Sequence, residues 1–173
     1  MNYAYFPRDE IIPESIKTVI NIFKTHEIEI DSNSNDSSNE ERLSSDDVLK
    51  ILMTDLSSEG YIVEKSKAKK DKIRMPVYLE NKEESNLFFE VDAWNENKGI
   101  VLEVEAGRAL DNHQFLKDIF EAAMMTNVKY LVIAVRECYR GRNDFLKIKN
   151  WIEPLYSTQR VKLDLKGLLL IGY

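Results

Sequence analysis

The chain has 173 residues, of which 43% are hydrophobic and 31% are charged, a composition that fits one globular domain with a sizeable core and excludes a disordered, fibrous or disulfide-stapled protein. The formal charge of −6 excludes a polybasic nucleic-acid binder, so any nucleic acid must be met by a local basic patch. A single cysteine, no signal-peptide pattern at the start, and no apolar run near the roughly 18 residues that cross a bilayer predict a cytoplasmic protein without a membrane partner.

The negative charge is concentrated in one stretch of the chain. Residues 31–47 carry six acids and one Arg and so contribute −5, which leaves −1 for the remainder. Ser, Asn and acids dominate this stretch and only Leu43 can be buried, so it cannot offset the entropy lost on ordering. We therefore expect a flexible, solvated loop over 31–45, between an N-terminal helical arm at 1–30 and a core at 46–173 within a single domain.

Amphipathic helices are expected on both sides of this loop. Pro13 can open the first helix, whose apolar face can lie in the core or on a second subunit. Ser45 or Asp46 can cap the second helix, and Gly60 can end it. The apolar stripes are Ile16, Val19, Ile20 and Phe23 in the first helix, and Val48, Leu49, Leu52, Met53 and Leu56 in the second.

A block of short strands follows, and then a third helix. Asp111 or Asn112 can cap this helix, which is expected over 112–125. Its apolar stripe comprises Phe115, Leu116, Ile119, Phe120 and Ala123. The strands are expected at Tyr61–Val63, Met75–Leu79, Leu87–Trp94 and Ile100–Ala106.

The last part of the chain alternates apolar strands with a helix. Tyr130–Val135 (YLVIAV) is an unbroken apolar run, typical of a central strand that is covered on both faces. A shorter helix is expected over about 144–152, and the chain closes on another buried strand, LLLIGY. Hairpin strands followed by a strand–helix–strand crossover predict a three-layer α/β/α domain around a central mixed sheet.

Acidic side chains gather in the predicted hairpin over 87–106. Side chains alternate along a strand, so the acids of each hairpin strand lie on one face. If residues 95–99 connect the strands, the two acidic faces coincide, with facing Cβ atoms about 5 Å apart. The predicted facing pairs are Asp92 with Glu103, Trp94 with Val101, and Glu90 with Glu105.

Four like charges in one place require compensation by protons, by basic side chains or by a divalent cation. Within the hairpin only Lys98 is basic, and it lies in the turn, whereas carboxylate oxygens at the end of a strand suit Mg²⁺ or Mn²⁺. The alternative is a solvated outer face, where acids are common. We favour the cation, because the helix after Gly107 must cover one side of the strand.

This order of helix, acidic hairpin, helix and apolar strand resembles the PD-(D/E)xK nuclease superfamily, whose fold is the restriction-endonuclease-like fold. The resemblance covers roughly residues 46–135 and rests on Asp92 and on Glu103-Val104-Glu105 in the next strand. It implies that Asp92, Glu103 and the carbonyl of Val104 bind Mg²⁺ or Mn²⁺. It also implies that Glu105 positions or deprotonates the attacking water. Most members have Lys at the position of Glu105, although some type II restriction enzymes have Glu there, and no Pro-Asp pair precedes the strand.

Other polar residues near the hairpin have weaker roles. Glu90 shares the acidic face but lies farther from the strand end. Glu59 can be an outer ligand, as the resemblance implies for an acid from that helix, or an ordinary helix-end acid. His113 and Gln114 begin the crossover helix near the proposed site, where surface or capping roles are the default.

Two basic clusters are predicted to contact a phosphate backbone. The first lies just before the hairpin and can equally be a solvated Lys-rich loop. The second follows the YLVIAV strand, at the edge where ligands gather in open α/β sheets. Arg108 can reach a phosphate near the metal or neutralise the carboxylates. The clusters comprise Lys65, Lys67, Lys69, Lys70, Lys72 and Arg74, and then Arg136, Arg140 and Arg142.

The sequence therefore predicts a Mg²⁺-dependent endonuclease that hydrolyses phosphodiester bonds of DNA, of a restriction or defence type. A homodimer is expected, because two symmetric sites are the simplest arrangement for cutting both strands. Because the motif Lys is absent, one alternative is a catalytically inactive nucleic-acid-binding or regulatory protein on the same scaffold. Another is an acidic immunity or inhibitor protein whose carboxylates face a basic partner.

Overall fold

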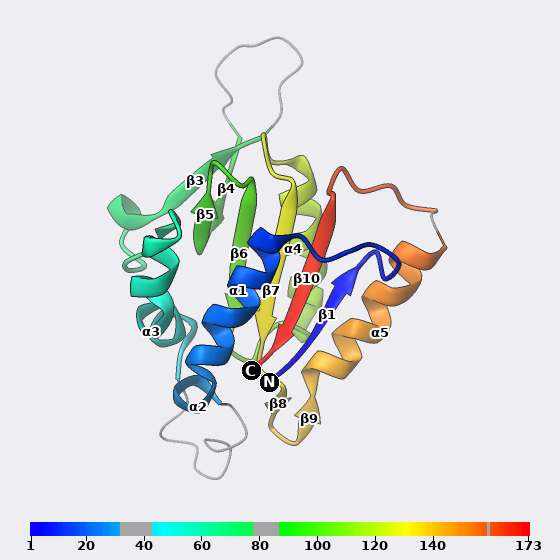
Figure 1. The fold of residues 1–173 in the computed structure, drawn as a ribbon, viewed down its shortest axis with the longest axis horizontal. Helices are drawn as coiled ribbons and strands as arrows, with labels where there is room; N and C mark the ends of the chain where they lie inside the picture. The colour runs from blue at the N-terminus through cyan, green and yellow to red at the C-terminus, as the bar shows by residue number, and fades with distance from the viewer. Residues whose placement is uncertain (32–42, 78–86, 159) are drawn as a thin grey trace.

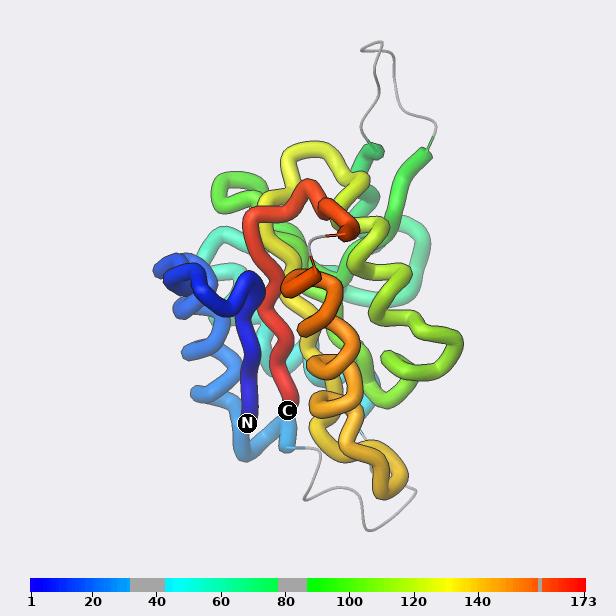
Figure 2. The backbone as a smooth tube through the Cα atoms, turned by 90° about the vertical axis from the view of Figure 1, so that its right-hand side faces the viewer, coloured from blue at the N-terminus to red at the C-terminus, as the bar shows by residue number. Residues whose placement is uncertain are grey.

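A computed structural model describes residues 1–31, 43–77, 87–158 and 160–173. Six strands form one mixed sheet in the order β1-β10-β7-β6-β5-β2, with helices on both faces (Figures 1 and 2). The predicted three-layer α/β/α arrangement is confirmed. The sheet comprises β1 (Asn2–Phe6), β2 (Ile62–Val63), β5 (Ala93–Asn95), β6 (Ile100–Glu105), β7 (Tyr130–Val135) and β10 (Gly167–Gly172). The helices are α1 (Glu14–Thr25), α2 (Glu27–Ile30), α3 (Ser45–Ser58), α4 (Gln114–Met124) and α5 (Asp144–Ser157).

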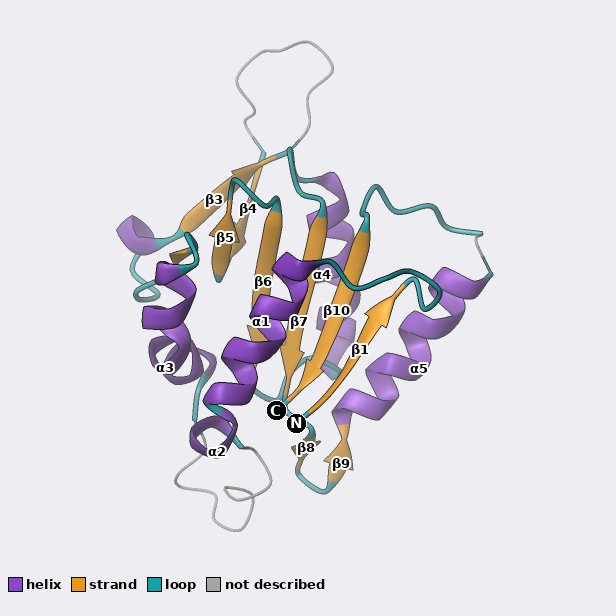
Figure 3. Cartoon of the chain, in the orientation of Figure 1, coloured by secondary structure: helices purple, strands orange, loops and turns teal. Residues whose placement is uncertain are grey.

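Smaller elements lie around this sheet (Figure 3). One antiparallel ribbon pairs β3 (Ile73–Pro76) with β4 (Phe88–Val91), and another pairs β8 (Cys138–Tyr139) with β9 (Arg142–Asn143). Short 3-10 helices precede β3 and α4, namely η1 (Lys69–Asp71) and η2 (Asp111–His113). Within the described ranges, no helix is long and apolar enough to cross a membrane.

The two faces of the sheet carry separate apolar cores. The core under α1 and α3 includes Leu102 and Val104 of β6, whereas the core under α4 and α5 includes Val101 of the same strand. This division follows from the alternation of side chains along a strand. The other odd-numbered side chains of β6, Glu103 and Glu105, therefore lie on the α4 side of the sheet.

The N-terminal segment belongs to the sheet. β1 pairs antiparallel with β10, so the two termini lie side by side (Figure 1). This strand is absent from the elements predicted for residues 1–30, because its partner lies at the far end of the chain and NYAYF has no strong apolar alternation. The apolar face of α1 packs in the core of its own sheet, which decides between the two locations predicted for it.

The start of α3 differs slightly from the prediction. Ser44, rather than Ser45 or Asp46, is the N-cap, because its Oγ accepts a hydrogen bond from the backbone N–H of Asp47 at 3.2 Å. The Asp47 carboxylate accepts one from the Ser44 N–H at 3.0 Å, which completes a capping box. Gly60 follows the helix end with φ +85°, as its predicted role requires.

The start of α4 also differs. Asp111 and Asn112 lie in η2, and His113 precedes the helix in a left-handed conformation without a side-chain cap, so both predicted caps are wrong. Phe120, predicted on the buried stripe, is 47% exposed. The buried stripe comprises Phe115, Ile119 and Ala122. The side chain at position 120, next to Ile119 on the helix, therefore points outward.

The remaining boundaries are close to the predicted ones. β7 and the final strand lie where the apolar runs place them, and α5 continues to Ser157, beyond the predicted 144–152. β3 begins at Ile73, before the predicted start at Met75. The end of that predicted strand, and residues 32–42 of the predicted loop, lie outside the described residues.

Candidate active site

The predicted strand over 87–94 is two strands, and Asp92 lies between them. β4 leaves the main sheet to pair with β3, whereas β5 pairs with β6 inside the main sheet. Val91 and Trp94 both enter the α4–α5 core although they are three positions apart. The alternation predicted across Asp92 is therefore wrong, while the predicted facing of Trp94 and Val101 is confirmed.

The break gives Asp92 two backbone contacts. Its Oδ2 accepts a hydrogen bond from the backbone N–H of Val104 at 2.8 Å, and its carbonyl accepts one from the N–H of Glu64 at 2.8 Å. The N–H and C=O of one strand residue point to the same side. The Val104 carbonyl therefore faces the Asp92 side of β6, as a ligand role for it requires.

Two of the three predicted facing pairs do not form. The ladder between β5 and β6 ends at Ala93, so Asp92 contacts Val104 rather than facing Glu103. Glu90 pairs across the β3–β4 ribbon with Arg74, and not with Glu105.

The predicted acids nevertheless lie together, because all of them line one cavity of about 210 Å³. Asp92 reaches it from the break between β4 and β5, and Glu103 and Glu105 reach it from β6, beneath α4. The carboxylates that line it are Glu64, Glu90, Asp92, Glu103, Glu105, Asp118 and Glu121, with Lys72 and Lys117 as the lining cations.

Four of these lining acids are missing from the predicted catalytic set. Gln114, Asp118 and Glu121 occur at positions i, i+4 and i+7 of α4, so they share one face, and this spacing is a signal that the sequence contains. Glu64 has no comparable signal. It reaches the cavity because its backbone N–H bonds to Asp92, although it lies just beyond the two-residue strand β2.

Two other predicted neighbours lie outside the cavity lining. Glu59 lies at the end of α3 and pairs with Lys98 at 2.8 Å, so the ordinary helix-end role is the one observed. His113 is exposed, and its ring centroid lies 5.7 Å from that of Trp151. The adjacent Gln114, by contrast, lines the cavity.

Burial and mutual repulsion disfavour the charged forms of the central carboxylates. Burial is the largest cause and raises the pKa of Asp92 to about 6, against the effect of the Val104 hydrogen bond. Burial, with the charges of Asp118 and Asp92, raises the pKa of Glu105 to about 7. Burial also raises the pKa of Asp118 to about 7, and it raises the pKa of Glu103 well above its usual value, with Asp92 and Asp118 adding to the effect.

The two lining cations neutralise acids at the periphery. Lys72 Nζ lies 2.9 Å from Glu64 Oε1 and 3.5 Å from Glu90 Oε2. Lys117 Nζ lies 3.1 Å from Glu121. Within the described ranges, no Lys or Arg forms an ion pair with the central group Asp92, Glu103, Glu105 and Asp118.

The basic residues predicted to contact phosphate fall into three groups, which are paired, buried or exposed. Lys72 lines the acidic cavity, and Arg142 Nε bonds to the buried Asp144 at 2.5 Å, so both charges are already paired. Arg136 is buried and donates to the carbonyl of Leu43, so it is not part of a surface cluster. The exposed members are Lys65, Lys67, Lys69, Lys70, Arg74, Arg108 and Arg140.

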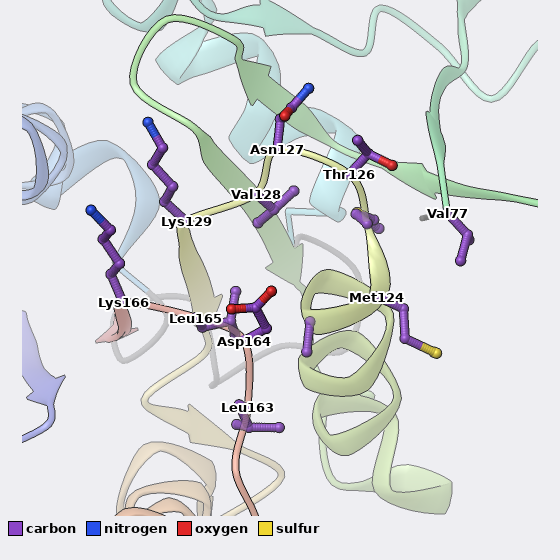
Figure 4. Close-up of a pocket in the computed structure, with 12 residues that line it drawn as sticks. Val77, Met124, Thr126, Asn127, Val128, Lys129, Leu163, Asp164, Leu165 and Lys166 are labelled. Atoms are coloured by element: carbon purple, nitrogen blue, oxygen red, sulfur yellow. The ribbon is translucent and has the colours of Figure 1, made fainter. Parts of the chain in front are cut away.

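A second cavity, of about 600 Å³, is larger but chemically poorer. It lies between the end of α4 and the segment before β10, with Met124, Val128 and Leu163 among its lining residues (Figure 4). Lys129 and Asp164 also line it, but no group of carboxylates converges there. Because a catalytic site requires convergent polar groups, the smaller acidic cavity is the better candidate.

The donor set of the acidic cavity fits a hard divalent cation such as Mg²⁺ or Mn²⁺, which prefers carboxylate and carbonyl oxygens. Oδ2 of Asp118 is buried and has no hydrogen-bond partner among the described residues. Among all the residues that the structure describes, no three His, Cys, Asp or Glu side chains are already arranged to hold a metal ion. Uncompensated carboxylates repel one another, so a cation would have to draw their oxygens inward.

The fold and this site define an α/β protein with a half-open acidic cavity between a strand end and a covering helix. The chain matches no family model, no curated protein and no solved structure. The functional inference therefore depends on the geometry of the cavity.

Proposed function

We propose that the protein is a divalent-cation-dependent endonuclease that hydrolyses phosphodiester bonds of DNA on a restriction-endonuclease-like core. The observation that carries this proposal is the convergence of Asp92, Glu103 and Glu105 in one cavity whose central carboxylates lack a cationic partner among the described residues. Such a site can do little chemistry on a phosphodiester by itself, because carboxylates repel phosphate. A divalent cation removes that repulsion.

The topology around the cavity supports the fold part of the proposal. β5 and β6 form an antiparallel pair, and β6 then connects through α4 to the parallel strand β7. This is the order of elements on which the resemblance depends. α3 lies on the opposite face from α4, and Ser45 at its start lines the cavity.

Asp92, Glu103 and the Val104 carbonyl would hold Mg²⁺ or Mn²⁺. Such an ion supplies Lewis-acid chemistry, because it polarises a phosphoryl oxygen and makes water nucleophilic at neutral pH. The hydrogen bond from the Val104 N–H fixes Asp92 Oδ2 against β6, so the aspartate and the strand end are held as one unit.

Glu105 would orient the attacking water and accept its proton. In the cation-free protein burial raises its pKa to about 7, so once ionised it is a stronger proton acceptor than an exposed glutamate. Lys117 lines the same cavity, and the charges of Lys117 and Arg108 lower the pKa of Glu105 against the larger effect of burial. Both cations would face the scissile phosphate.

The exposed part of the first basic cluster would guide the DNA backbone. Lys69 and Lys70 lie in η1, and the chain continues directly to Lys72 at the cavity wall. Contacts of this kind position a backbone without specifying sequence. Cutting of both strands would be achieved by a homodimer with two symmetric sites.

The burial of some of the lining carboxylates argues against the alternative function of an acidic immunity or inhibitor protein. Carboxylates that face a basic partner must be accessible, whereas Asp118 is 6% exposed and Glu64 is equally buried. These two acids therefore point into the protein rather than toward a partner surface, whereas Glu90 is 55% exposed.

Plasmid cleavage tests the proposed activity. We expect the wild type to nick supercoiled DNA with Mg²⁺ or Mn²⁺ and to be inactive in EDTA. Glu105→Gln removes the base and should reduce the rate by roughly 10²- to 10⁴-fold. Glu59→Gln removes the same charge outside the cavity and should leave the rate unchanged. Intact plasmid after incubation of the wild type with several DNA substrates and both metals would refute the proposal.

A further inference from the structure

His26 lies at the junction of three helices. It is the C-cap of α1 and the N-cap of α2, and its carbonyl accepts hydrogen bonds from the backbone N–H groups of Glu29 and Ile30 at 2.9 and 3.1 Å. Its ring nitrogen Nε2 lies 2.9 Å from Oδ2 of Asp55 on α3. One residue therefore holds α2 through its backbone and reaches a third helix through its side chain.

The ring of His26 lies between two carboxylates that belong to different helices. Its Nδ1 is 2.8 Å from Oε1 of Glu29 on α2, and its Nε2 contacts Asp55 from the other side. A neutral imidazole has one N–H donor and one acceptor nitrogen, whereas an ionised carboxylate only accepts. Both contacts are therefore hydrogen bonds at the same time only when the ring is protonated on both nitrogens.

We propose that His26, Glu29 and Asp55 form a pH-sensitive clasp, in which the doubly protonated ring ties α2 to α3 and loss of one proton lets α2 open. α2 depends on such contacts because it has only four residues, and a helix this short is unstable alone. Its other anchor is Ile30, which is buried in the core under α1 and α3. The clasp involves neither the acidic cavity nor a cation, so the inference is independent of the proposed function.

The charges around the ring favour its protonated form. Hydrogen bonds to Glu29 and Asp55 raise the pKa of His26 above its ordinary value of 6.5, while burial acts in the opposite direction. The largest charge effects on the ring come from the same two carboxylates. Lys24 on α1 and Glu27 on α2 are engaged with other groups.

The direction of the pH dependence follows from these contacts. When α2 is open, the ring of His26 titrates near 6.5, and when α2 is closed it titrates at a higher pH. Well below pH 6.5 the ring is protonated in both forms, so the clasp stabilises the closed form fully, and this stabilisation is lost as the pH rises through the pKa of the closed form. By linkage, the opening equilibrium of α2 increases from low to high pH by the ratio of the acid dissociation constants of the open and closed forms.

NMR of the ring and amide hydrogen exchange together test the clasp in the full chain. The His26 ring is titrated directly, and His113→Gln assigns the signals because the chain has two histidines. Opening of α2 is followed through the amide protons of Glu29 and Ile30, which are bonded to the His26 carbonyl. We expect their protection, corrected for the intrinsic pH dependence of exchange, to fall as the pH rises through the measured pKa of His26, by the ratio that linkage sets.

Asp55→Asn keeps the shape of the clasp and removes one of its charges. We expect the pKa of His26 to fall toward 6.5 and the pH dependence of α2 protection to shrink with it. Glu14→Gln, the loss of an exposed charge at the start of α1, should change neither.

Two results would overturn the clasp. One is a pKa of His26 at or below 6.5 in the wild type, and the other is protection of α2 that stays constant while the ring titrates. Should Asp55→Asn not fold, Glu29→Gln takes its place, because the side chain of Glu29 is 60% exposed. A pKa of His26 that this variant leaves unchanged would equally overturn the proposal.

Discussion

Asp92→Asn should abolish DNA cleavage and, at the same time, make the cation-free protein more stable at neutral pH. Activity should fall on the order of 10³-fold, because Asp92 would supply an ionised oxygen to the divalent cation, and this cation would stabilise the charge that develops on the scissile phosphate. Stability should rise by about 1–3 kcal/mol, since burial raises the pKa of Asp92 from 3.8 to about 6 and the neutral amide avoids that cost. The amide oxygen can still accept the hydrogen bond from Val104.

Cleavage rates and thermal unfolding of the same preparations check both effects. Glu90→Gln is the matched control, because Glu90 lines the same cavity but its side chain is 55% exposed and lies beside Lys72. We expect its rate to stay within a few-fold of the wild type. An Asp92→Asn protein that unfolds at a lower temperature than the wild type at pH 7.5 would show that Asp92 has a structural role instead of a functional one.

The stability of the cation-free protein should fall as the pH rises from about 4 to about 7.5. In the unfolded chain Asp92 and Glu105 titrate near 3.8 and 4.5, whereas in the folded protein their pKa values are about 6 and about 7. Well below pH 3.8 these groups carry protons in both states, so their contribution to stability is fully present. As the pH rises, the unfolded state loses the protons first, and the contribution disappears by the time the folded groups ionise.

A divalent cation should reverse this trend. Mn²⁺ binds the ionised carboxylates, so it should raise the unfolding temperature by about 10 °C at pH 7.5 and have little effect at pH 5. Other groups titrate too, and the lowered pKa of Asp47 acts in the opposite direction at acid pH. Subtracting the profile of Glu105→Gln isolates the contribution of the cavity. A wild-type profile that rises between pH 4 and pH 7.5, with no difference from the variant, would contradict the account.

Most of the sheet could be predicted from the sequence because its signals are local. The apolar run of β7 and the stripes of α1 and α3 are periodic over a single element, and the turn at residues 95–99 fixes the facing of Trp94 and Val101. β1 could not be predicted, because its only support is a pairing with β10 at the other end of the chain. Propensity within five residues does not encode such a partner.

The candidate site was predicted in part. Alternation along β6 correctly groups Glu103 and Glu105, because that strand is regular. The same reasoning fails at Asp92, where the chain moves from one sheet to another and the side chain turns to the Val104 N–H. Asp118 and Glu64 were missed because tertiary packing brings them to the cavity, although the helical spacing of Asp118 from Gln114 and Glu121 was visible in the sequence.

The most direct test of the central claim, that the acidic cavity is a divalent-cation site, is a calorimetric titration of Mn²⁺ into the wild-type protein at pH 6.5. It is performed in two buffers that differ in ionisation enthalpy. The account predicts saturable binding with release of protons, because the cation displaces protons from carboxylates whose pKa values lie near that pH. Absence of binding, or binding that releases no protons and persists in Asp92→Asn, would contradict it.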